Sequence, residues 1–159
     1  CPTAYYAPLG PISNEEKFRK IFSEYDVNSR VVFMGYHKNP SQYARTMDLY
    51  LNEYPFGSGI GILDAMAAGC PVVSMFDEKG PQQARYGGTY FGLDRVLHNG
   101  STEEYVNLAC RLCEDKALYK EWVAHARAQY EKRANEKEYA KSFEAIIQQF
   151  IKTKSFYQL

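Results

Sequence analysis

The sequence has 159 residues, of which 45% are hydrophobic and 15% aromatic, and its formal net charge at pH 7 is zero. This length and composition predict a globular domain with a sizeable core and exclude an intrinsically disordered chain. A chain without net charge has no positive field to attract nucleic acid or an anionic membrane, so neither is expected as a partner.

Two kinds of targeting segment are not indicated. No apolar run approaches the roughly 18 residues of a transmembrane helix, and the first ten residues lack the basic start and apolar core of a signal peptide. The four cysteines are irregularly spaced, which favours a reducing cytoplasm over a disulfide framework. Because the sequence starts abruptly on a strand-like segment, we expect a domain of a longer protein.

The first half of the chain alternates strand-like and helix-like segments. Helices are predicted from Ser13 or Asn14 to about Tyr25, over Pro40–Met47, and over Gly59–Ala68, where Gly69 stops the helix. Such alternation predicts an α/β fold with a Rossmann-like parallel sheet covered by helices on both faces. The predicted strands are Ala4–Leu9, Arg30–Gly35 (a buried strand), Asp48–Asn52 and Pro71–Met75.

The second half is predicted to be a helical extension of the same single domain, residues 1–159. One helix opens at Ser101 or Thr102, and a second runs over about Leu118–Lys132. The last helix, residues 138–152, carries its apolar side chains on one face. These are Tyr139, Phe143, Ile146, Ile147, Phe150 and Ile151.

The turn Tyr54–Gly59 leads from a predicted strand into a predicted helix. The first turn of a helix has free backbone N–H groups and the positive end of the helix dipole, which together can hold a phosphate. Glycines at 57, 59 and 61 would let a diphosphate approach the backbone closely, and Ser58 could cap the helix or donate its hydroxyl. Alternatively, the glycines serve only the tight turn.

Asp64 is the only charged residue between Gly57 and Val73. A carboxylate in such apolar surroundings needs hydrogen-bond partners, because an unpaired buried charge is costly. Two ribose hydroxyls would satisfy it, as they satisfy acidic residues in dinucleotide-binding folds. A loop N–H or an arginine of the same chain is the alternative partner.

The segment Pro55–Val73 resembles the donor-site signature of GT-B glycosyltransferases. The likeness is greatest to the bacterial adhesin N-glycosyltransferases and the O-GlcNAc-transferase-like group. It rests on Asn52–Gly57, Gly61–Asp64, Gly80-Pro81 and Glu104–Glu114. The resemblance implies one half of a GT-B fold, namely the carboxy-terminal, donor-binding domain without its amino-terminal acceptor domain.

By this resemblance, the helix start at Ser58, Gly59, Ile60 and Gly61 holds the nucleotide diphosphate and Asp64 binds the ribose. The sequence departs from the family pattern at two positions of this site. Phe56 stands where many members have a glutamate near the phosphates, and Ile60 stands where the adhesin enzymes have asparagine. The lysine or arginine that grips the diphosphate in many members would lie upstream of the first strand.

Two further loops follow predicted strands at the edge where ligands bind in parallel α/β sheets. Gly35, Tyr36 and His37 are candidates for contact with the nucleobase, or they form an ordinary loop. By resemblance, Gly80 and Gln82 would face the sugar or the distal phosphate, with a solvated loop as the alternative. His98 and His125 are interpreted as structural or surface residues.

The expected function is transfer of a hexose or N-acetylhexosamine from a nucleotide diphosphate sugar, with a uridine nucleotide favoured, to a protein, lipid or glycan acceptor. No cofactor, metal cluster or catalytic residue is identified, which suits the metal-independent chemistry of GT-B enzymes. The acceptor site and any general base would lie mostly in the amino-terminal domain, so the fragment is expected to be inactive alone. The alternatives are a sugar-nucleotide epimerase and a non-catalytic nucleotide-binding or interaction module. In GT-B enzymes the final helix commonly crosses to the amino-terminal domain, which would leave Phe143, Ile147 and Phe150 partly exposed here.

Overall fold

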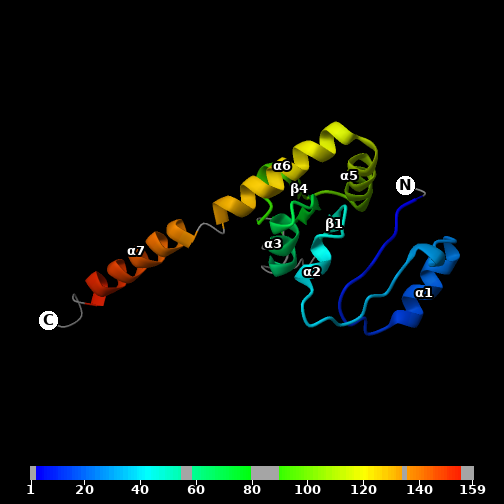
Figure 1. Ribbon diagram of the computed structural model, residues 1–159, viewed down its shortest axis with the longest axis horizontal. Helices are drawn as coiled ribbons and strands as arrows, with labels where there is room; N and C mark the ends of the chain where they lie inside the picture. The colour runs from blue at the N-terminus through cyan, green and yellow to red at the C-terminus, as the bar shows by residue number, and fades with distance from the viewer. Residues whose placement is uncertain (1–2, 55–58, 80–89, 134–135, 155–159) are drawn as a thin grey trace.

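The computed structural model describes residues 3–54, 59–79, 90–133 and 136–154, and Figure 1 shows their arrangement. In these ranges helices alternate with short strands in the first two thirds of the chain and then take over entirely. The helices are α1 (Glu15–Glu24), α2 (Ser41–Ala44), α3 (Gly59–Ala67), α5 (Thr102–Glu114), α6 (Lys116–Arg133) and α7 (Glu136–Lys154). The strands are β1 (Tyr50–Leu51), β2 (Val72–Val73), β3 (Met75–Phe76) and β4 (Leu97–His98), and η1 (Asn28–Arg30) and η2 (Leu93–Arg95) are single 3-10 turns.

The strands pair in parallel, which confirms the predicted α/β fold. β1 pairs with β2, so that Tyr50 lies opposite Val72. β3 pairs with β4, so that Met75 lies opposite Leu97. The predicted strand Pro71–Met75 is divided at Ser74 into β2 and β3, and β4 is a strand that the sequence analysis did not predict.

The two predicted amino-terminal strands form single bridges and no continuous strand. Tyr6 bridges Val31 and Leu9 bridges Gly35, both in parallel. The prediction that Arg30–Gly35 is a buried strand was wrong, because the segment forms only bridges and Val32 is 46% exposed, although Val31 is buried. A β-branched run is compatible with a strand that packs on one face only, and sequence alone does not show which faces are covered.

The core lies between α3, β2, α5 and α6. Three residues on one face of α3 are almost fully inaccessible to solvent, namely Ile62, Ala65 and Met66. Their spacing of three and four residues forms the stripe that a packed helix needs. The remaining core residues include Val72, Val73, Phe91, Leu112, Trp122 and Ala126.

Side-chain caps fix two helix starts that the sequence left open. Asn14 accepts a hydrogen bond from the N–H of Lys17 at 3.1 Å and is the cap of α1. Ser101 forms a capping box with Glu104, because each side chain bonds the other residue's backbone N–H. Such reciprocal bonds satisfy donors that a helix end leaves unpaired. The capping residues are therefore Asn14 and Ser101.

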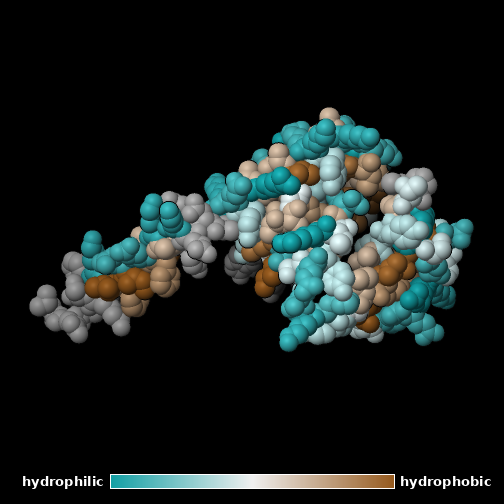
Figure 2. Space-filling view, viewed as in Figure 1, coloured by the Kyte–Doolittle hydropathy of each residue, from teal (hydrophilic) through white to brown (hydrophobic). Residues whose placement is uncertain are grey.

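Helix α7 projects away from the body of the molecule (Figure 1). Its apolar side chains form a stripe that is visible in Figure 2, and Phe143, Ile147 and Phe150 are 57%, 42% and 59% exposed. This confirms the predicted exposure of the stripe. The helix is nonetheless unsuited to crossing a bilayer, as is every other helix in the described residues.

Candidate functional site

The first turn of α3 is crowded on one side by an aromatic ring. A Cβ atom at Gly59 would lie 3.1 Å from Cε2 of Tyr90, so glycine lets the ring pack against the helix start. The guanidinium carbon of Arg133, at the end of α6, lies 5.3 Å from the centre of the same ring. Ile60 is 76% exposed and Gly61 is partly buried, whereas Ser58 lies outside the described residues.

Asp64 lies in the second turn of α3 and is partly buried. Its backbone C=O accepts the helical hydrogen bond from Ala68. Within the described ranges its carboxylate makes no hydrogen bond or ion pair with another residue. The intramolecular partner that would have explained this carboxylate is therefore not found in these parts of the chain, and its oxygens can accept hydrogen bonds from a ligand.

The loop that joins β1 to α3 starts at Asn52, whose side chain and backbone C=O are both hydrogen-bonded. The buried side chain of Asn52 donates to Oγ of Ser74 at 3.1 Å. The hydroxyl of Tyr105 donates to the backbone C=O of Asn52 at 2.9 Å. Burial raises the pKa of Tyr105, and the nearby carboxylate of Glu53 raises it further, so this hydroxyl keeps its proton and remains a donor.

The predicted nucleobase loop is attached to α2 through a histidine. Nε2 of His37 donates to the C=O of Met34 at 2.8 Å, and the hydroxyl of Tyr43 donates to Nδ1 at 2.9 Å. Both ring nitrogens of His37 are thus engaged within the protein, while the neighbouring Tyr36 is 78% exposed. Gly35 adopts a φ of +68°, which glycine tolerates best.

The loop after β3 is held by Asp77, which accepts hydrogen bonds from Tyr54 at 3.4 Å and from the N–H of Lys79 at 2.8 Å. This links the loop after β1 to the loop after β3 at the same edge of the fold. Gly80 and Gln82, which the resemblance assigns to the sugar or the distal phosphate, lie outside the described residues.

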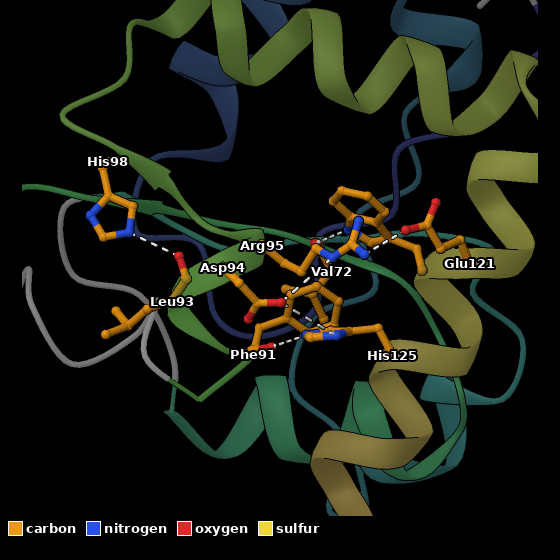
Figure 3. Close-up of polar contacts among 9 residues, drawn as sticks. Val72, Phe91, Leu93, Asp94, Arg95, His98, Glu121 and His125 are labelled. Carbon is orange, nitrogen blue, oxygen red and sulfur yellow. Dashed lines mark hydrogen bonds and ion pairs between the residues drawn. The ribbon is translucent and has the colours of Figure 1, made fainter.

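Figure 3 shows the hydrogen bonds and ion pairs that hold the segment from Phe91 to His98 in place. Nε2 of His125 donates to the C=O of Phe91 at 2.6 Å, and Arg95 pairs with Glu121 at 2.5 Å. His98 donates to the C=O of Leu93 at 2.9 Å. The prediction that His98 and His125 are structural or surface residues is confirmed.

The features that the sequence analysis missed include the His37–Tyr43 pair, the ring of Tyr90 over Gly59 and the Arg95–Glu121 pair. Only the first had a local signal, since a histidine and a tyrosine lie six residues apart. No group of three or more His, Cys, Asp or Glu residues that could hold a metal ion occurs among the described residues.

Residues 8–115 match the family model of glycosyl transferases group 1. The chain belongs to this family. No curated protein matches it. The match includes the predicted donor segment Ser58–Asp64, the predicted nucleobase loop and the loop after β3, so all candidate site residues fall within the family region.

Solved structures show the same fold at low sequence identity. Anabaena Alr3699/HepE in complex with UDP has a TM-score of 0.65 and 18% identity, over 91% of this chain and 42% of that one. WaaG, a glycosyltransferase involved in lipopolysaccharide biosynthesis, has a TM-score of 0.65 and 22% identity, over 80% and 34%. A Thermobaculum terrenum O-GlcNAc transferase has a TM-score of 0.66 and 18% identity, over 82% and 26%. The chain thus has the GT-B fold of these proteins and spans less than half the length of each.

Proposed function

We propose that this chain is the donor-binding domain of a glycosyltransferase and that it binds a UDP-hexose or a UDP-N-acetylhexosamine. The observation that carries the proposal is the carboxylate of Asp64, which is partly buried beside the start of α3 and has no protein partner in the described ranges. Support comes from family membership and from HepE, a protein of the same fold that is known in complex with UDP and with UDP-glucose.

In this proposal, different segments at one edge of the fold bind different parts of the nucleotide sugar. Backbone N–H groups at residues 58–61 bind the diphosphate, since they lie at the positive end of α3. Asp64 accepts hydrogen bonds from the ribose hydroxyls. Gly35 and Tyr36 contact the base, and Gly80 and Gln82 contact the sugar or distal phosphate.

The proposed role of the site in the transfer reaction is to stabilise negative charge on the leaving diphosphate. When the bond from the sugar to the diphosphate breaks, negative charge grows on the departing phosphate oxygens, and preorganised donors at the start of α3 stabilise that charge. This requires no metal ion. The acceptor (a protein, lipid or glycan) and the general base would belong to an amino-terminal domain outside this chain, so the chain alone would bind the donor without transferring it.

A subgroup within the family is part of the same proposal. The match of Asn52–Gly57 and Gly61–Asp64 to the adhesin N-glycosyltransferase pattern supports that group, as does the shared fold of an O-GlcNAc transferase. Under this assignment α7 crosses to the amino-terminal domain and its apolar stripe becomes covered there.

Titration calorimetry with UDP tests the donor site. Asp64→Ala is expected to weaken UDP binding by about 10- to 100-fold, because hydrogen bonds to a charged group contribute about 1.5–3 kcal/mol. Asp64→Asn retains one acceptor oxygen and should lose less affinity. Glu114→Ala, a substitution at an exposed position of α5, is the matched control and should bind UDP as the unaltered chain does. Absence of binding at millimolar UDP, or equal affinity in Asp64→Ala, would contradict the proposal.

A further inference from the structure

The first turn of α3 has little in its own sequence to keep it ordered. It contains Gly59 and Gly61, and glycine is among the residues least favourable to a helix. Ile60, between them, is 76% exposed, and the buried stripe of the helix begins only at Ile62. The proposed function assigns the diphosphate to the backbone N–H groups of this turn. A contact from another element can therefore decide how well these donors are ordered.

The ring of Tyr90 makes such a contact. The three heavy atoms nearest to a Cβ atom placed on Gly59 all belong to Tyr90, at 3.1, 3.7 and 3.8 Å. The ring thus occupies the space into which any other residue at position 59 would direct its side chain. Tyr90 is itself partly buried and packs against the core cluster. It therefore joins the first turn of α3 to the body of the domain.

One face of α6 runs along the segment that carries Tyr90. His125, Gln129 and Arg133 lie on that face, because each is four residues from the next. Gln129 is close to Gly92, where a Cβ atom would lie 3.2 Å from its Nε2. The guanidinium carbon of Arg133 lies 5.3 Å from the centre of the Tyr90 ring, which is within the range of a cation–π contact.

Phe91, the residue after Tyr90, anchors the same segment in the core. Its side chain is fully buried, and the centre of its ring lies 4.9 Å from that of His125. Nε2 of His125 also donates to the C=O of Phe91 at 2.6 Å (Figure 3). Because Phe91 cannot move without opening the core, the backbone next to it places Tyr90 firmly against α3.

We propose that Tyr90 is a positioning residue of the donor site, which orders the first turn of α3 before the nucleotide binds. This inference rests on the proposed function. When the donors of a site are already in place, ordering them does not reduce the free energy of binding. Tyr90 acts through the backbone at Gly59, so it affects the affinity for the phosphate groups and not the affinity for the base.

A role in core packing alone leads to a different expectation. Loss of the ring would then lower the stability of the whole domain, and it would weaken the binding of nucleoside and nucleotide to the same extent. The two roles are separated by comparing a ligand that has phosphate groups with one that has none.

Titration of Tyr90→Leu with UDP and with uridine makes this comparison. The variant lacks the ring, so its UDP affinity should fall about fivefold, because ordering the glycines becomes part of the binding step. Its affinity for uridine, measured by NMR at millimolar concentration, should stay the same. Tyr90→Phe keeps the ring and should bind both ligands as the unaltered chain does. Val96→Ala removes apolar atoms at another buried position and is the control for a general loss of stability.

Amide hydrogen exchange, resolved by residue with NMR, tests the ordering of the turn without any ligand. In a helix that begins at Gly59, the N–H of Leu63 bonds to the C=O of Gly59. This amide should exchange several-fold faster in Tyr90→Leu than in Tyr90→Phe or the unaltered chain. The amide of Ala68, which bonds to the C=O of Asp64 at the other end of α3, is the control and should not change.

Unchanged UDP affinity in Tyr90→Leu would overturn the inference, as would an equal loss of UDP and uridine affinity. It would also be overturned if Val96→Ala lost as much UDP affinity as Tyr90→Leu, or if the exchange of the Leu63 amide were the same with and without the ring. Absence of UDP binding by the unaltered chain would instead contradict the proposed function. In that case the exchange of Leu63 would still decide whether Tyr90 orders the turn.

Discussion

At the scale of single residues, Cys70 makes the stability of the folded chain depend on pH in the alkaline range. It follows α3, is only 3% exposed, and its Sγ lies 3.6 Å from the C=O of Pro71. Burial raises its pKa from 9.0 to about 12, and the carboxylate of Asp48 acts in the same direction. The unfolded chain loses this proton first, so stability that is complete below pH 9 declines as the pH rises toward 12.

We therefore predict that the urea midpoint of the chain falls between pH 8.5 and 10.5 and that Cys70→Ala reduces this fall. A pKa difference of three units corresponds to at most about 4 kcal/mol. Burial also raises the pKa of Cys113, but this thiol is exposed, so Cys113→Ala should reduce the fall less than Cys70→Ala does. Tyr105, whose pKa is also raised by burial, contributes to the fall in every variant. Identical pH profiles for Cys70→Ala and the unaltered chain would contradict the prediction.

The pair His37–Tyr43 gives a second prediction at this scale. Tyr43→Phe removes the hydroxyl that donates to Nδ1 of His37, so the loop that presents Tyr36 loses its attachment to α2. Under the proposed function, UDP affinity should fall several-fold, while the free energy of unfolding falls by about 1 kcal/mol. Calorimetry and urea unfolding measure the two effects. Tyr25→Phe, at a position that is 74% exposed, should change neither. Lower stability with unchanged UDP affinity would show that the pair only supports packing.

At the scale of elements, α7 carries an apolar stripe in which Phe143, Ile147 and Phe150 are 57%, 42% and 59% exposed. Exposed apolar patches promote association. We predict that Ile147→Lys with Phe150→Lys lowers self-association, as measured by sedimentation velocity, and leaves the unfolding of the body unchanged. Ala145→Lys with Gln148→Lys adds the same charge on the opposite face of α7 and is the control. If both double variants lower association equally, charge and not the stripe is responsible.

The elements differ in how far the sequence determines them. Helix starts at Asn14 and Ser101 were predicted to within one residue, because a cap and the helix it opens are neighbours in sequence. Strands were predicted less well. The run Arg30–Gly35 contains β-branched residues, yet it forms only bridges, because strand pairing depends on partners that lie far away in the chain. Strand β4 was missed for the same reason: β3, its partner, is far from it in sequence.

At the scale of the whole molecule, the sequence predicts the fold and the family, but it does not predict most of the contacts that hold the site in place. Asp64 can be noticed in the sequence because it is a single charge in an apolar segment, and the start of α3 can be noticed because of its glycines. The ring of Tyr90 against Gly59 and the hydroxyl of Tyr105 on Asn52 join residues that are distant in sequence. Only tertiary packing brings such pairs together, so a motif search cannot find them.

The position of the core along the chain has a consequence for synthesis. Among the described residues, the core cluster and the side chains packed on it begin at Met47 and require Trp122 and Ala126 of α6. Domains generally fold as units when synthesised from the amino terminus. During translation we therefore expect the aromatic side chains of the first segment to emerge from the ribosome long before the core can close. Nascent chains of this domain would then depend on chaperones until α6 has left the exit tunnel.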